Sequence, residues 1–205
     1  MNTSSAEQGF TLIEVLVALV LMAVVSLVSW RGLDSVIRIR DHVERDAQRD
    51  AAILRVMGQL ERDVQMRAPD YVLQGAGAAP TKTGTLPAAI DVARNADAPL
   101  RFDVVRAMGT SGASWQRVRW WQESGMLRRA SAAPGDSLPL PQPGPGATVL
   151  QSVSAFNVRA YIPGQGWASL PLGQAAQAAT GLEFTIDVAS GSGPAQRYRR
   201  VVALP

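Results

Sequence analysis

The chain has 205 residues, 47% of them hydrophobic, and 20 Lys and Arg stand against 17 Asp and Glu, a net charge of +3. This size and hydrophobicity allow one domain with a core and one membrane segment, and so small a charge excess argues against nucleic acid as the main partner. The absence of cysteine and the single histidine, His42, exclude disulfides, thiol nucleophiles and thiolate or multi-histidine metal sites.

The first predicted element is a membrane-spanning helix over residues 10–30. The 21 residues from Phe10 to Trp30 contain one charge, Glu14. At a rise of 1.5 Å per residue they span about 31 Å, the thickness of the hydrocarbon core of a bilayer. A secretory signal peptide has a basic start and a shorter apolar run, whereas residues 1–9 carry no Lys or Arg.

Glu14 needs an explanation, because a lone glutamate in hydrocarbon costs about 2.5–3.5 kcal/mol. Cleavage between Gly9 and Phe10 would free an α-amine on Phe10, one helical turn before Glu14. That amine can pair with the carboxylate in the same chain, or with the carboxylate of a neighbouring helix in an assembly. Gly9 suits a peptidase because its backbone enters a narrow active site without a side chain.

The stretch "GFTLIE" (residues 9–14) before a long apolar run resembles the class III signal of type IV pilins and type II secretion pseudopilins. The resemblance implies that residues 1–9 are a leader, that a prepilin peptidase cuts after Gly9, and that the new N-terminus, Phe10, is methylated. It also implies that Glu14 helps the subunit to enter a filament.

The charges around the span depart from the family pattern. Gln8 and Glu7 stand where family leaders usually carry Lys or Arg, while Arg31, Arg38 and Arg40 follow the span. The positive-inside rule would place these arginines in the cytoplasm. The motif is more specific than this statistical rule, so we expect a single-pass protein of the bacterial inner membrane with its globular domain in the periplasm.

An amphipathic continuation of the helix is predicted over residues 31–68. Helix is disfavoured at Ala68 because Pro69 follows it. Most of the apolar stripe is expected to pack on the protein's own core, and His42 is expected to be an exposed polar position. The apolar positions recur at three- and four-residue steps: Leu33, Val36, Ile37, Val43, Ala47, Ala51, Leu54, Met57, Leu60 and Val64.

Part of this stripe is a candidate surface for a partner helix. Ala47 and Ala51 lie one turn apart, and small side chains let another helix or a sheet approach closely. Leu54 would add apolar area beside them. The alternative is that all three residues face the protein's own sheet.

Residues 69–205 are predicted to form a β-rich globular domain. The fold class is therefore α+β and pilin-like, with a long N-terminal helix packed on a largely antiparallel sheet. Residues 71–99 are expected to be mainly loops, and the Pro/Gly-rich residues 134–147 a connector. Strands are expected over 100–107, 115–124 and the following "GMLRRAS" with a turn at Ser124-Gly125, 149–162 with a bend or bulge, 166–172, 181–189 and 196–204.

Arginines alternate with aromatic residues in several of these strands. Arg117 and Arg119 share one strand face, as do Arg197 and Arg199, which is typical of a solvated sheet surface over an aromatic core. Trp167 is expected to close a sheet edge. The less favoured interpretation is a platform for single-stranded nucleic acid built with Trp115, Trp120, Trp121 and Tyr198.

No convergent set of catalytic residues is found, so we expect no enzyme, no cofactor, no metal and no small-molecule substrate. Asp91 and Asp97 lie close together in a loop-like stretch, and solvated turn residues are favoured there over a calcium site.

The C-terminal half resembles the minor pseudopilin J of type II secretion. The resemblance rests on "WRGLDSVIRIRD", "WWQESGMLRRAS", "VLQSVSAFNVRAYIPGQGWASLPL" and "GLEFTIDVA…QRYRRVVALP" in this order. It implies a tip complex with minor pseudopilins of I, K and H type, which initiates and caps the pseudopilus for export of folded proteins across the outer membrane. The alternatives are a W-type minor pilin of a type IV pilus, a DNA-binding pilin and, least favoured, a membrane-tethered enzyme.

Overall fold

The computed structural model describes residues 11–74, 85–94, 99–109, 114–172, 177–189 and 193–204, and for residues 32–37, 39 and 42 it describes the backbone alone. The chain divides into two compact units, Met1–Ala51 and Ala52–Pro205. The prediction that the His42 side chain is exposed concerns a side chain outside the described part of the structure.

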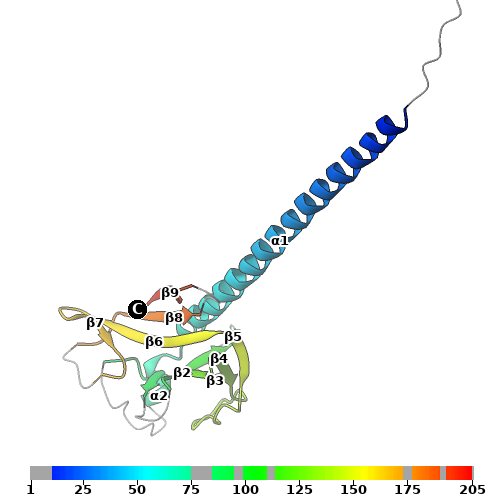
Figure 1. The fold of residues 1–205 in the computed structure, drawn as a ribbon. Helices are drawn as coiled ribbons and strands as arrows, with labels where there is room; N and C mark the ends of the chain where they lie inside the picture. Colours follow the sequence, from blue (N-terminus) through cyan, green and yellow to red (C-terminus); the bar gives the residue numbers. More distant parts are fainter. Residues whose placement is uncertain are drawn as a thin grey trace, which may run out of the picture. The chain divides into compact units, whose positions relative to one another are not determined.

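Helix α1 (Leu12–Gln65) is a single 54-residue helix (Figure 1). It ends three residues before the expected Ala68, because the backbone there pairs with the sheet instead. The Ala68 N–H donates to the Val105 carbonyl at 2.8 Å, and Arg67 forms a β-bridge with Arg106. Since Pro69 follows, a non-helical backbone at Ala68 is also the one that the chain prefers.

The strands of the second unit form two antiparallel sheets (Figure 1). Sheet A has the order β1-β2-β3-β4-β5 and sheet B the order β7-β6-β8-β9. The bounds are β1 (Ile90–Ala93), β2 (Arg101–Met108), β3 (Ser114–Glu123), β4 (Met126–Ser131), β5 (Ala147–Gln151), β6 (Val153–Ile162), β7 (Gly166–Ser169), β8 (Gly181–Val188) and β9 (Gln196–Ala203).

One hydrophobic core joins the C-terminal part of α1 to both sheets. Apolar residues of the helix from Ile53 to Val64 are buried in the same cluster as residues of sheet A and sheet B. Phe102 of β2 meets Phe184 of β8 edge to face, with the ring centroids 5.1 Å apart. The prediction of a helix packed on antiparallel sheet in an α+β, pilin-like fold is confirmed.

Local turn chemistry explains the β3–β4 hairpin that the sequence predicts, and strand pairing confirms the β8–β9 hairpin. Ser124 and Gly125, between β3 and β4, both have positive φ (49° and 73°), as a two-residue type I′ turn requires. β8 and β9 pair along their whole length, from Gly181↔Ala203 to Val188↔Gln196.

Two expected segments differ from the structure. Residues 71–99 are not only loop, because they include most of helix α2 (Asp70–Gln74) and all of β1. Residues 149–162 are not one bent strand. Ser152 adopts a positive φ of 59°, and there the chain leaves β5 of sheet A and enters β6 of sheet B. The Ser152 carbonyl accepts a hydrogen bond from Ala189 N–H at 2.7 Å, which fixes this crossing point.

Candidate functional site

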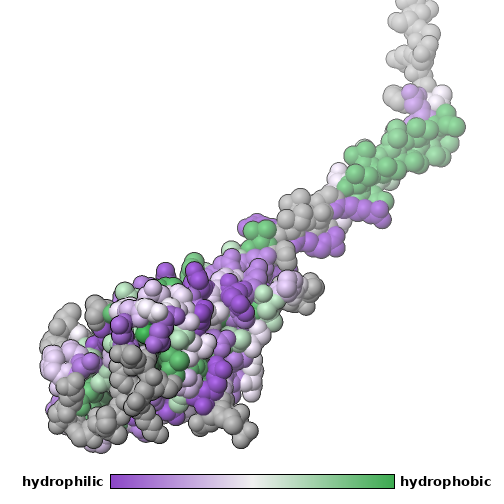
Figure 2. Space-filling model, turned by 90° about the vertical axis from the view of Figure 1, so that its left-hand side faces the viewer, coloured by the Kyte–Doolittle hydropathy of each residue, from purple (hydrophilic) through white to green (hydrophobic). Residues whose placement is uncertain are grey.

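The apolar half of α1 is the first functional feature of the molecule. Residues Leu12–Arg31 have a mean hydropathy of 2.7 and are long and apolar enough to cross a membrane, and none of this stretch is buried within the protein. On the face shown in Figure 2 these residues make an apolar band. Trp30, 77% exposed, lies at the C-terminal end of this stretch, and tryptophan is enriched at membrane–water interfaces.

Glu14 lies in the first turn of α1 and is the last residue of the "GFTLIE" stretch. Thr11 precedes the helix, and its carbonyl and Oγ1 lie 3.1 Å and 3.4 Å from the Glu14 N–H. Threonine followed three residues later by glutamate is the spacing of a capping box, in which an acid also favours the positive end of the helix dipole. Within the described residues the Glu14 carboxylate has no ion pair. Gly9 and Phe10 lie outside the described residues.

The proposed partner-helix residues have exposed side chains. Ala47 and Ala51 are exposed, and Leu54 is 68% exposed. By the 3.6-residue period these three positions lie on one side of the helix, turned about 130° from the buried positions around Leu60. Of these three residues Leu54 alone belongs to the second unit, and its neighbours Ile53 and Val56 are the ones buried in the core there.

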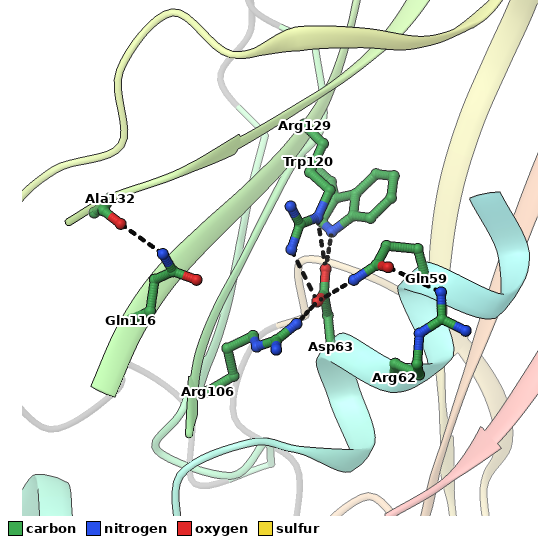
Figure 3. A network of polar contacts seen from close by, with 8 residues as sticks. All are labelled: Gln59, Arg62, Asp63, Arg106, Gln116, Trp120, Arg129 and Ala132. Carbon is green, nitrogen blue, oxygen red and sulfur yellow. Dashed lines mark hydrogen bonds and ion pairs between the residues drawn. The ribbon is translucent and has the colours of Figure 1, made fainter. Parts of the chain in front are cut away.

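A polar network inside the domain was not predicted from the sequence. Asp63 is fully buried, and its carboxylate accepts hydrogen bonds from Arg106 (2.6 Å), Trp120 (3.0 Å) and Gln59 (2.9 Å), and two from Arg129 (2.9 and 3.0 Å) (Figure 3). The sequence signal that could have indicated this network is an acidic residue, Asp63, among the apolar stripe positions Leu60 and Val64, which are buried. The network fixes the helix to the sheet.

The arginines of the strands do not all lie on a solvated surface. Arg129 turns inward to Asp63, and Arg119 donates two hydrogen bonds to the buried Asp103, at 2.8 and 3.0 Å. Donating these hydrogen bonds to the Asp103 carboxylate raises the pKa of Arg119 above its ordinary value. Arg197 and Arg199, by contrast, are 71% and 65% exposed in their side chains, as a solvated face requires.

The aromatic residues divide between core and surface. Trp120 is fully buried, and Trp115 and Trp121 are half-buried, so the three do not form one exposed platform. Trp167 lies on β7, an edge strand of sheet B, with its ring 5.3 Å from that of Tyr161.

The acids considered for calcium do not form a described site. Asp91 lies on strand β1, not in a turn, and pairs with Arg101 at 3.4 Å. Asp97 lies outside the described residues. Within the described part of the chain, no group of three or more His, Asp or Glu side chains could hold a metal ion.

Comparison with protein families covers nearly the whole chain. The model of the family "Type II secretion system (T2SS), protein J" matches residues 31–204, and that of the prokaryotic N-terminal methylation motif matches residues 4–30. The second match contains the "GFTLIE" stretch and most of the apolar half of α1, and the first contains both β-sheets. This chain therefore belongs to the protein J family of type II secretion systems, a family of pseudopilins.

Proposed function

We propose that this pseudopilin acts at the tip of the pseudopilus, in a complex with minor pseudopilins of I, K and H type that initiates and caps the filament. The observation that carries the proposal is the match to protein J over residues 31–204, behind a methylation motif and an exposed apolar helix. In this role the chain works by binding and not by catalysis. The globular domain is in the periplasm, and the apolar half of α1 holds the subunit in the inner membrane until it assembles.

Processing is the first test of this proposal. We expect a prepilin peptidase to cut between Gly9 and Phe10 and to methylate the new α-amine. Intact-mass measurement of the membrane form from its native host should give a chain that begins at Phe10 and carries one methyl group. A mature N-terminus at any other residue would contradict the proposed processing, although membership of the family would stand.

The Glu14 carboxylate is proposed to pair with the N-terminal amine of Phe10 or of a neighbouring subunit. Glu14→Val should insert into the membrane at least as well as wild type, because it removes a cost of about 2.5–3.5 kcal/mol. Its crosslinking to the other minor pseudopilins in membranes should fall about tenfold, which corresponds to about 1.4 kcal/mol of lost pairing. Cleavage after Gly9 should continue.

Glu44→Val is the matched control, because Glu44 is also an exposed glutamate of α1 but lies beyond the span. It should crosslink like wild type. Undiminished crosslinking of the Glu14→Val subunit would argue against the pairing.

Ala47, Ala51 and Leu54 are proposed to receive the helix of an I-type pseudopilin in parallel packing. A fragment that begins near Gly32 should be soluble, since it lacks the span, and should bind the I-type fragment without Glu14. Ala51→Glu should change the free energy of unfolding by less than about 0.5 kcal/mol, because the side chain is exposed. It should weaken the complex, because a buried charge without a partner is costly.

Two further variants make this test specific. Ala52 is half-buried against the core, so Ala52→Glu should destabilise the fragment itself. Gln151 is an exposed residue of β5, and Gln151→Glu should affect neither property. If Ala51→Glu binds the I-type fragment as wild type does, the helix face is not the interface.

A further inference from the structure

A pocket on the outer face of sheet B is rich in arginine. It has a volume of about 330 Å³ and is lined by four arginines and one glutamate, together with neutral residues. Arg94 follows β1, Arg159 is on β6, and Arg197 and Arg199 are on β9, so three separate parts of the chain bring these guanidinium groups together.

The acids around the pocket offset only half of this positive charge. Glu183 is 2% exposed and lies between Arg159 and Arg199. One of its carboxylate oxygens is 3.2 Å from a guanidinium nitrogen of Arg159, and the other is 3.2 Å from a guanidinium nitrogen of Arg199. Asp187 makes two 2.8 Å hydrogen bonds with Arg197, and they raise the pKa of that arginine. Four guanidinium charges against two carboxylates leave a net charge of +2.

Donors remain available for an anion at this site. Arg94 donates a hydrogen bond to the side-chain amide oxygen of Asn157 at 3.1 Å. Because this acceptor is neutral, the contact does not neutralise the positive charge of Arg94. The Arg197 and Arg199 side chains are 71% and 65% exposed, so a ligand can reach them without displacing the fold. A guanidinium group binds a carboxylate through two parallel hydrogen bonds, which suits this geometry.

An apolar shelf lies beside the arginines on the same sheet face. Tyr161, 41% exposed, and Trp167 meet edge to face next to Gly181, which has no side chain, and Arg159 is two residues from Tyr161 on β6. Side chains two residues apart on a strand point to the same face. An extended peptide bound along this sheet face can therefore pack an apolar side chain against Tyr161 and Trp167. Its acidic side chain two residues away points to the same side and then lies among the arginines.

We propose that this pocket binds the carboxylate side chains of an extended acidic segment of a partner protein. Glu183 and Asp187 favour separate carboxylates over a continuous run of phosphates, because they would repel a polyanion that covers the whole face. The site is independent of the helix surface of α1 and of the tip role, so each can fail without the other.

The test uses the full chain in detergent micelles and a short peptide with blocked ends in which leucine and glutamate alternate. Titration followed by NMR of the arginine Nε–Hε groups should shift the signals of Arg94 and Arg199. The double variant Arg94→Gln/Arg199→Gln should bind the peptide at least about tenfold more weakly. Arg117→Gln, in the polar pocket on the outer face of sheet A, is the matched control and should bind like wild type.

Several results would overturn the proposal. One is that wild type and the double variant bind the peptide with the same affinity. Another is that a peptide with glutamine in place of glutamate binds as well as the acidic peptide, because this would mean that the peptides only partition into the micelle. Tighter binding of inorganic sulfate or of a single-stranded oligonucleotide would assign the pocket to other anions. If the double variant does not fold, Arg94→Gln alone decides, since its described polar contact is with Asn157 only.

Discussion

Asp63→Ala is expected to lower the free energy of unfolding by about 3–5 kcal/mol, the cost of removing one partner from a buried ion-pair network. The substitution removes the acceptor of five hydrogen bonds and leaves Arg106 and Arg129 close together without their shared anion. It also leaves the indole N–H of the fully buried Trp120 without this acceptor. Urea unfolding of the full chain in detergent, followed by tryptophan fluorescence, measures the loss.

Two comparisons separate the network from general effects of losing a carboxylate. Asp91→Ala removes an acid whose pairing with Arg101 is exposed, and should cost less than about 1 kcal/mol. Replacing Asp63, Arg106 and Arg129 together by Leu, Met and Met should recover most of the stability, because no charge is then buried alone. A loss below about 1 kcal/mol for Asp63→Ala would contradict the structural role given to the network.

Gly146→Ala is expected to cost about 2–5 kcal/mol, for two reasons that add. Gly146 has a φ of +70°, a region that costs other residues about 1–2 kcal/mol. A Cβ atom there would lie 2.7 Å from both the Arg129 carbonyl oxygen and the ring of Trp121, and 3.0 Å from the Ala130 Cβ. Such overlap forces the backbone or the ring to move, at a further cost of about 1–3 kcal/mol.

Gly144→Ala is the matched control for Gly146. It lies two residues earlier in the same connector, and a Cβ atom there would meet nothing within 4 Å. Its effect should stay within about 0.5 kcal/mol. Thermal unfolding of the two variants side by side gives the comparison, and equal melting temperatures would show that the connector adjusts freely around residue 146.

The sequence predicts well those parts of the fold that depend on neighbours along the chain. The β3–β4 hairpin follows from Ser124-Gly125, and the β8–β9 hairpin from two alternating runs around a Gly/Ser turn. The division into two sheets does not follow, because it depends on a positive φ at Ser152, a residue type that is common in ordinary strands and turns. The sheet to which a strand belongs is a matter of long-range packing.

The functional features divide in the same way. The processing motif is contiguous over residues 9–14, and for this reason it is visible in the sequence alone. Three partners of Asp63, namely Arg106, Trp120 and Arg129, are 43–66 residues away from it along the chain. The periodicity of the helix sequence therefore cannot identify them. Strand periodicity also assigned Arg119 to a solvated face, because alternation on a strand does not reveal that Asp103 lies opposite it on β2.

The attachment of Asp63 has a mechanical consequence. Its sheet partners Arg106, Trp120 and Arg129 belong to β2, β3 and β4, three consecutive strands of sheet A. A force pulling on the C-terminal part of α1 would be shared among all three strands at once, because every bond meets at one carboxylate. Bonds loaded together must break together, whereas bonds loaded in series open one after another. A pull on α1 would therefore move the folded domain as a whole before it detached the helix from sheet A.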